Sequence, residues 1–238
     1  MASAPHHVAT SITLRQPKAS SARPQRRVTS MVVTDAATVE QVIVRNCSIS
    51  TVSKSVFYDN AGATVSSLVF NNVVMSGLGA GQGTIDIRKG TYGTVTVKNC
   101  TVVGGRDFIR ADAGRVTGAV NISNNIFDGC TLNNGNGILY VRSTPESYVV
   151  NNNLFLNENG ENNLLCKASG VTVPTAMGNN WFFNCTAAKF WTGLITQEIG
   201  TAGGGILEAD PVKDAAAADY TITNSDLAAA GVGPACWR

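Results

Sequence analysis

One short pattern, apolar-x-apolar-x-Asn-x-x-apolar, occurs six times in this chain of 238 residues. Its asparagines follow one another at intervals of 26, 27, 25, 28 and 28 residues. A period in this range is typical of solenoids that add one coil per repeat, and the alternation of apolar positions inside each unit indicates β-strands. The repeated asparagines are Asn46, Asn72, Asn99, Asn124, Asn152 and Asn180.

An asparagine at the same point of every coil suits a tight turn in which the backbone enters the left-handed region. Stacked coils lie about 4.8 Å apart, so the side-chain amide of one asparagine can donate a hydrogen bond to the next. The sequence therefore predicts an all-β fold. We expect a right-handed, single-stranded parallel β-helix of about six coils with an Asn ladder.

Composition divides the chain into three parts. Residues 1–34 contain five basic residues, no acidic residue and no apolar periodicity, which predicts a disordered or targeting-like tail. We expect the β-helix over residues 35–211 and a C-terminal cap over residues 212–238. No stretch approaches the ~20 apolar residues that a membrane-spanning helix needs.

Two interpretations of the tail stay open. Its Ala, Ser, Arg and Pro content resembles a transit peptide, which would direct the protein to a plastid. Alternatively, the tail precedes a module of a longer exported protein, and the module would then be secreted or lie at the cell surface. We favour the second interpretation.

The charge distribution argues against nucleic acid as a partner. The chain has 18 basic and 16 acidic residues, and removing the five basic residues of the tail leaves 13 against 16, a net charge of −3. This is no electrostatic footprint for a polyanionic helix. The two histidines, His6 and His7, lie in the tail, so the folded region has neither a histidine-based catalytic triad nor a His-ligated metal.

A second apolar strand lies between consecutive asparagine units. If its side chains alternate, Phe57, Ile87, Ile109, Val141 and Cys166 point into the core. The residue after each then points outward. Aligning these outward positions up the stack predicts one column with four consecutive cations, Tyr58, Arg88, Arg110, Arg142 and Lys167.

Stacked cations repel one another, so this column requires anions nearby. An acidic polysaccharide would supply them, with Phe108 and Tyr140 flanking the cations and holding sugar rings. The alternative is a solvated face on which Asp86 and Asp112 are local counter-ions. The predicted substrate-binding residues are Arg88, Lys89, Phe108, Tyr140 and Asp112.

The pattern loosens after Asn180. Asp219–Thr223 should add an edge strand, and Ser225 with Asp226 should cap a short helix that runs through Ala230. We expect the aromatic residues of this region to complete the terminal core; they are Trp181, Phe182, Phe183, Phe190 and Trp191.

These coils resemble the pectin-lyase-like superfamily of right-handed parallel β-helices. The tail with Asp210-Pro211 and the strand Asp219–Thr223 looks like uncharacterised C-terminal modules of exported bacterial polysaccharide-utilisation proteins, and the resemblance covers residues 36–238. It implies a substrate cleft along the sheet that bears the cations. It also implies β-elimination, in which an Arg or Lys removes the proton α to a uronate and a cation neutralises the carboxylate.

The resemblance assigns catalytic roles to Arg142, Lys167 and Arg110. Some members of the superfamily use calcium, for which Asp86 and Asp112 are weak candidates here; no other cofactor is expected. The segment Gly105–Ile109 also resembles the nucleophile motif of pectin methylesterases. However, Gln82 is followed by Gly83 instead of a second catalytic Asp, so that activity is disfavoured and Asp107 is expected to be a turn or ion-pair residue.

The sequence thus predicts an exported, monomeric β-helix protein that binds acidic polysaccharide, and it leaves open whether the protein also cleaves the polymer by β-elimination. Two alternatives from other classes remain. One is a non-catalytic carbohydrate-binding or structural module of a larger protein, and the other is a β-helical adhesin.

Overall fold

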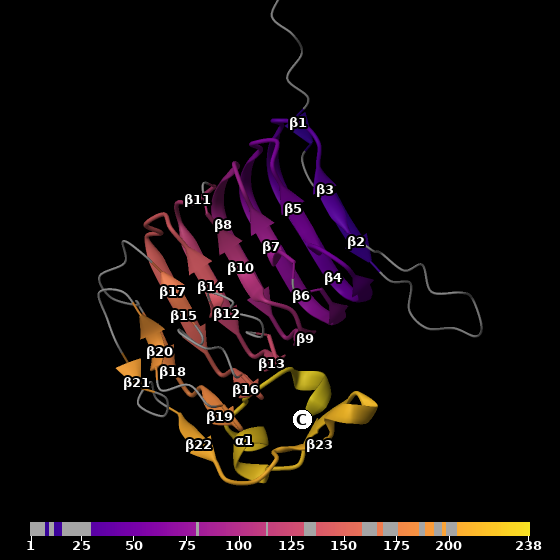
Figure 1. Cartoon of the computed structure of the whole chain (residues 1–238), viewed down its shortest axis with the longest axis vertical. Coiled ribbons are helices and arrows are strands. Elements are labelled where there is room, and N and C mark those ends of the chain that lie inside the picture. The colour runs from indigo at the N-terminus through magenta and orange to yellow at the C-terminus, as the bar shows by residue number, and fades with distance from the viewer. Residues whose placement is uncertain are drawn as a thin grey trace, which may run out of the picture.

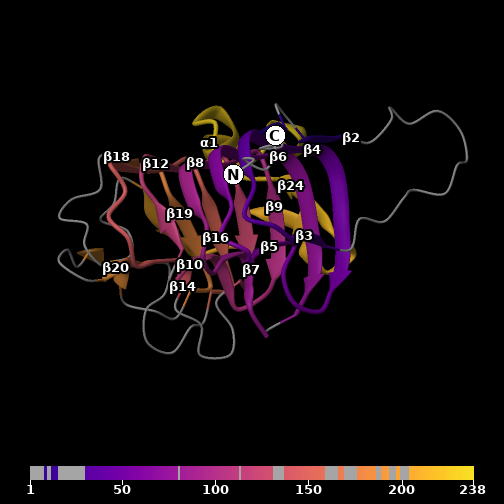
Figure 2. The ribbon, with the colours of Figure 1, turned by 90° about the horizontal axis from the view of Figure 1, so that it is seen from above.

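The strands of the chain stack in parallel as a β-solenoid of about five turns in a computed structural model of the protein, close to the number of coils that the repeats predict (Figure 1). The two principal sheets form separate layers, with β8 and β12 in one and β7, β10 and β14 in the other (Figure 2). The structure describes residues 8–9, 12–15, 30–79, 81–112, 114–130, 137–158, 166–168, 176–185, 189–192, 197–198 and 204–238.

The larger sheet, called sheet A, has 14 strands. All its pairings are parallel, as expected when each coil adds one repeat of the same direction. Its strands are β1 (Val8–Ala9), β2 (Ile12–Arg15), β4 (Thr38–Val52), β6 (Thr64–Leu78), β8 (Thr91–Lys98), β9 (Thr101–Gly104), β11 (Arg115–Val116), β12 (Ala119–Ser123), β13 (Ile126–Asp128), β15 (Ser147–Asn151), β16 (Leu154–Leu156), β18 (Ala176–Gly178), β19 (Trp181–Phe183) and β22 (Gly205–Leu207).

Sheet B has 8 strands and contains the second apolar strand of each coil. Only its last pair, β20 with β21, is antiparallel. Its strands are β3 (Met31–Val33), β5 (Phe57–Asp59), β7 (Gly83–Ile87), β10 (Asp107–Ala111), β14 (Gly137–Val141), β17 (Cys166–Ala168), β20 (Lys189–Thr192) and β21 (Gln197–Glu198).

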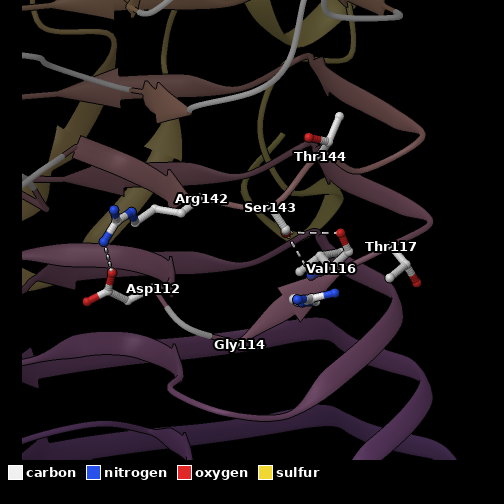
Figure 3. Close-up of a pocket in the computed structure, with 8 residues that line it drawn as sticks. Asp112, Gly114, Val116, Thr117, Arg142, Ser143 and Thr144 are labelled. Carbon is white, nitrogen blue, oxygen red and sulfur yellow. Dashed lines mark hydrogen bonds and ion pairs between the residues drawn. The ribbon is translucent and has the colours of Figure 1, made fainter.

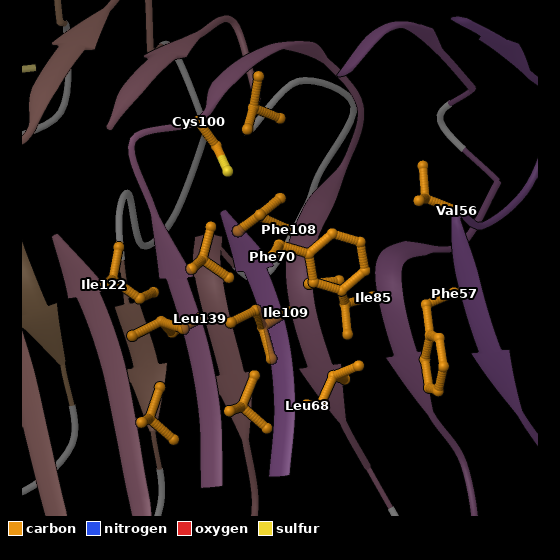
Figure 4. Packing of buried hydrophobic residues seen from close by; sticks show 14 of the residues in the cluster. Val56, Phe57, Leu68, Phe70, Ile85, Cys100, Phe108, Ile109, Ile122 and Leu139 are labelled. Carbon is orange, nitrogen blue, oxygen red and sulfur yellow. The ribbon is translucent and has the colours of Figure 1, made fainter. Parts of the chain in front are cut away.

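Apolar side chains from both sheets fill the space between them (Figure 4). Equivalent residues of successive coils stack on one another. The rings of Phe127, Phe155 and Phe182 form one such stack, with centroids 5.3 Å apart and planes 10° apart at each step. A stack of this kind buries large apolar surfaces along the axis of the solenoid, so Phe182 belongs to the core as the sequence predicts.

The predicted asparagine turns are present, with one correction. Asn46, Asn72 and the next three repeat asparagines have φ between 53° and 57°, as a left-handed turn requires. In the last repeat, Asn179 takes this conformation with a φ of 53°, not the predicted Asn180. Both residues are asparagine, and the first of the two closes the turn. Two neighbouring pairs of turns are joined directly, by bonds from Asn72 Nδ2 to Asn46 Oδ1 at 2.9 Å and from Asn179 Nδ2 to Asn152 Oδ1 at 2.8 Å. Between them, Asn99 Nδ2 donates to Asn71 Oδ1 and Asn124 Nδ2 donates to Gly231 O.

A second ladder, which the sequence analysis missed, lies inside the solenoid at the position after the turn. Asn125, Asn153 and Asn180 are completely buried there. Asn125 Nδ2 donates to Asn153 Oδ1 at 3.0 Å, and Asn153 Nδ2 donates to Asn180 Oδ1 at 3.0 Å. Each amide also donates to a backbone carbonyl, at 2.8 to 3.0 Å. The sequence indicates this ladder by the Asn-Asn pairs that begin the last three turns.

The C-terminal segment covers the flank of the solenoid across several coils (Figure 1). It comprises the antiparallel pair β23 (Val212–Asp214) and β24 (Asp219–Ile222), the helix α1 (Ser225–Ala229), and the 3-10 turns η1 (Ala215–Ala217) and η2 (Ala235–Trp237). The predicted edge strand and short helix are confirmed, but the helix is capped by Asn224 instead of Ser225 or Asp226. Within the described residues, no helix is long and apolar enough to cross a bilayer.

Outward apolar residues of sheet A explain why the segment packs on this flank. The row that begins with Ser48 and Val74 continues through Thr101 to Ile126, Leu154 and Trp181, so it becomes apolar in the later coils. Ile126 and Leu154 pack against buried residues of the C-terminal segment, which include Tyr220, Leu227 and Val232. Two polar contacts fix the segment: Tyr220 Oη donates to Asp128 Oδ2 at 2.7 Å and Trp237 Nε1 donates to Thr101 Oγ1 at 2.8 Å.

Asn153→Ala should destabilise the protein strongly. The change removes an amide that donates to Ile122 O and Asn180 Oδ1 and accepts from Asn125, and each buried partner left without a bond costs ~1–3 kcal/mol. We expect the free energy of unfolding in urea to fall by about 3 kcal/mol. Asn121→Ala, on the outer face, is the control and should change it by less than about 1 kcal/mol; equal effects would contradict the internal ladder.

Leu227→Ala tests the packing of the C-terminal segment. Leu227 is buried between the C-terminal segment and the flank of the solenoid, and truncating a buried leucine costs about 2–5 kcal/mol. Ile206→Ala is the control because Ile206 is 65% exposed. We expect the melting temperature to fall for Leu227→Ala and to stay within about 2 °C of the wild type for Ile206→Ala. A neutral Leu227→Ala would show that the segment does not pack there.

Candidate functional site

The predicted cations lie in two rows of sheet B instead of one column. The first row runs through β5, β7, β10, β14 and β17. Cα pairing in this row joins Tyr58 with Asp86, Asp86 with Arg110, Arg110 with Tyr140 and Tyr140 with Lys167. Only Arg110 and Lys167 of the four predicted cations belong to it, and Tyr140 separates them.

Arg88 and Arg142 lie in a second row, directly after the ends of their strands. The backbone nitrogen of Arg88 donates to Asp59 O at 2.7 Å, and that of Arg142 donates to Ala111 O at 3.0 Å. Asp112, which follows Ala111, lies between them. The predicted column of four consecutive cations is therefore wrong. Tyr140 separates Arg110 from Lys167 in the first row, and Asp112 separates Arg88 from Arg142 in the second.

A slip of two residues explains the error. The prediction set Ile87 beside Ile109, whereas Ile109 pairs with Ile85 on one side and with Leu139 on the other. Alternation has a period of two, so a two-residue slip leaves every side chain on its correct face and changes only its neighbours. The predicted inward and outward directions of Ile87, Ile109, Arg110 and Arg142 are accordingly confirmed.

Aspartates neutralise most of the arginine charge. Arg88 Nε lies 2.7 Å from Asp86 Oδ1, and Asp86 is completely buried beneath the arginines. Asp112 accepts two bonds, from Arg110 Nη2 at 3.0 Å and from Arg142 Nη1 at 2.8 Å. The alternative interpretation of Asp86 and Asp112 as local counter-ions is thus confirmed.

The two carboxylates have opposite pKa shifts. Burial raises the pKa of Asp86, although Arg88 and Arg110 partly oppose this effect. The hydrogen bonds from Arg142 and Arg110 lower the pKa of Asp112. The same bond to Asp112 raises the pKa of Arg142, so this guanidinium remains protonated.

Phe108 is wrongly assigned to the binding face. Its side chain is 1% exposed and packs edge-on against Phe127, with ring centroids 5.1 Å apart. Phe108 and Ile109 are consecutive, yet both belong to the core, as Figure 4 shows, because β10 begins at a corner of the coil. Tyr140 does lie on the face, where its ring centroid is 5.8 Å from Cζ of Arg110.

The remaining predicted residues are placed as follows. Lys89 is exposed beside Arg88. The backbone of Lys167 pairs with Tyr140 and with Thr192, and its side chain lies outside the described part of the chain. Asp107 is buried, with Arg106 Nε 4.0 Å from its Oδ2, in agreement with the predicted ion-pair role.

The calcium candidates face cations. Both oxygens of Asp112 accept from arginines, and Asp86 contacts Arg88. A calcium ion requires several oxygen ligands that are not engaged by other cations. Among the described residues, Asp86 and Asp112 therefore do not form a suitable ligand set.

A pocket of about 600 Å³ lies at the corner where two coils pass from sheet B to sheet A (Figure 3). Ser143 joins the coils beneath it, because its hydroxyl accepts from Val116 N at 3.0 Å and donates to Val116 O at 3.1 Å. The sequence analysis missed this pocket, since neighbouring coils form it from residues about 30 positions apart. Its lining residues are Asp112, Gly114, Arg115, Val116, Thr117, Arg142, Ser143 and Thr144.

Asp112→Asn should lower stability at neutral pH and lose this effect in acid. The pKa of Asp112 in the folded protein lies below its ordinary value of 3.8, so the ionised form stabilises the fold above that value and the contribution is lost as the pH falls through the folded pKa. We expect a loss of about 0.5–1 kcal/mol at pH 7, after screening.

Urea unfolding at pH 7 and at about pH 2 measures this difference. The control Asp35→Asn removes an exposed carboxylate outside the site. A destabilisation by Asp112→Asn that is equally large at both pH values would show that the ion pairs do not cause it.

Comparison with known proteins gives one match. Residues 16–104 match a family described as "Domain of unknown function (DUF4957)". The match includes Arg88 and Lys89 and ends before Arg110 and Arg142. No curated protein and no solved structure matches the chain. The fold is that of a parallel β-solenoid, and its first coils are similar to this family.

Proposed function

We propose that the outer face of sheet B binds acidic polysaccharide. The observation that carries this proposal is the position of Arg142, whose side chain is 58% exposed while Asp112 holds its guanidinium from one side. Arginine binds carboxylates in bidentate fashion, and an exposed guanidinium that Asp112 holds in position is suited to contact a carboxylate of the polymer.

The charge balance of the face supports a modest affinity. Arg88, Lys89, Arg110 and Arg142 contribute four positive charges, and Asp86 and Asp112 contribute two negative ones, which leaves +2. So few net charges give weak contacts to a polyanion. Salt weakens these contacts further, because interactions between exposed charges are largely screened beyond ~8–10 Å. Tyr140 adds an aromatic ring to the face; the guanidinium of Arg110 lies over one side of it, so a sugar ring would stack on the other side.

Binding is better supported than catalysis by Arg142 or Arg110. A base must release its proton near the working pH, whereas the bond to Asp112 raises the pKa of Arg142. Arg110 donates to the same carboxylate. We therefore propose that both residues pair with carboxylates of the polymer instead of removing protons.

Cleavage by β-elimination is a second proposal, and it depends on Lys167. The backbone of this residue pairs with Tyr140 in the first row, two coils beyond Arg110, so a lysine base would belong to the same row as a cation able to neutralise a uronate. A binding face of this kind suits an exported, monomeric protein. If the protein binds no polysaccharide, the remaining alternatives are a structural module and an adhesin.

Affinity electrophoresis of the purified chain through gels that contain polygalacturonate, alginate or chondroitin tests binding. Dextran serves as the neutral polymer. We expect retardation by at least one acidic polymer and about tenfold weaker binding for Arg142→Gln, because a charge-assisted hydrogen bond is lost. Lys98→Gln, an exposed charge change on sheet A, is the matched control.

Ultraviolet absorbance of the same mixtures, with and without calcium, detects the unsaturated product of β-elimination. A rise that Lys167→Ala abolishes would assign a lyase with this base. A flat trace together with retardation would leave a binding protein. Equal migration in all four gels would refute the proposed function.

A further inference from the structure

We infer that the corner pocket binds the oxyanion group of one sugar unit, with Arg115 as a second cationic contact opposite Arg142. This inference rests on the proposed function and adds a subsite and a specificity-determining residue to it. The oxyanion is either a uronate carboxylate or a sulfate ester, since both present planar or tetrahedral oxygens to a guanidinium.

The two arginines reach the pocket from different sheets. Arg142 follows the last residue of β14 in sheet B, whereas Arg115 begins β11 in sheet A, where it pairs with Thr91. Both line the same hollow of about 600 Å³, and ligand sites typically measure roughly 300–1,000 Å³. This volume is sufficient for one sugar ring with its charged substituent.

The charge of the lining favours an anion. Arg115 and Arg142 contribute +2 and Asp112 contributes −1, so the pocket carries a net charge of +1. Both oxygens of Asp112 already accept from arginines, which limits its repulsion of an incoming anion. Within the described residues, the guanidinium of Arg115 is exposed and forms no hydrogen bond or ion pair, so all its donors can face the ligand.

Hydroxyl groups divide into structural and accessible ones. Ser143 is engaged with Val116 on both sides. Thr144 is exposed in the lining, and its hydroxyl suits hydrogen bonding to a sugar hydroxyl. Gly114 is required where two coils approach closely, because a Cβ there would lie 2.6 Å from the backbone oxygen of the buried Ile87.

Arg115→Gln, compared with Lys98→Gln, tests the subsite. Both changes remove one exposed positive charge, but only the first lies in the pocket. Affinities are measured by titration with polygalacturonate, unsulfated chondroitin and sulfated chondroitin. We expect Arg115→Gln to weaken binding of the favoured polymer about tenfold and Lys98→Gln to weaken it less than twofold. The melting temperature of each variant confirms that it is folded.

The polymers distinguish the source of the oxyanion. A loss of affinity confined to sulfated chondroitin assigns a sulfate subsite, and a loss on polygalacturonate or unsulfated chondroitin assigns a carboxylate subsite. Thr144→Val supplies a second variant in the lining and should weaken the same polymer severalfold.

Wild-type binding that neither pocket variant changes would overturn the subsite and leave the proposed function standing. Equal losses in Arg115→Gln and Lys98→Gln would also overturn it, because the effect would then be one of overall charge. Absence of wild-type binding to every polymer would overturn both inferences.

Discussion

The stacking of one coil on the next depends on the left-handed turn that Asn46, Asn72 and their equivalents make once per coil. The turn gives every coil the same corner, and hydrogen bonds between neighbouring amides join the corners of the first two repeats and of the last two. In the later coils the buried asparagines behind the turn add a second set of bonds, which also satisfies backbone carbonyls inside the solenoid. A disruption of this turn would therefore displace the rows of residues whose alignment depends on it.

The electrostatics of sheet B are one result of that alignment. The register sets Asp86 against Arg110 and places Asp112 between the second-row arginines. Aspartates and arginines thus alternate along the stack, which converts repulsion between neighbouring coils into attraction. The face retains only a small positive excess, and Arg142 lies where the chain turns toward the corner pocket.

The sequence analysis anticipated the features that one coil determines by itself. Asparagine turns were recognised because a single residue type combines a tolerance for positive φ with a stacking amide, and side-chain direction followed from a period of two. Register was not recoverable. Ile85 and Ile109 are 24 residues apart, whereas Ile109 and Leu139 are 30 apart, so coils of unequal length can be aligned in several ways. Phe108 was misplaced because a corner, unlike a regular strand, turns two consecutive side chains inward.

The corner pocket was unpredictable for a related reason, since Arg115 and Arg142 come together only through the stacking of two coils.

The C-terminal segment gives this solenoid a long-range connection that simple repeat stacks lack. In such stacks each coil contacts only its neighbours, so the coils at an end can fray independently. Here the bond from Trp237 to Thr101 joins residues 136 positions apart, and Asn124 and Asn179 both donate to carbonyls of the same segment. The segment couples the coils that it spans, so these coils are expected to unfold together. During synthesis it emerges after the coils that it covers, so their apolar flank stays uncovered until this segment has been made.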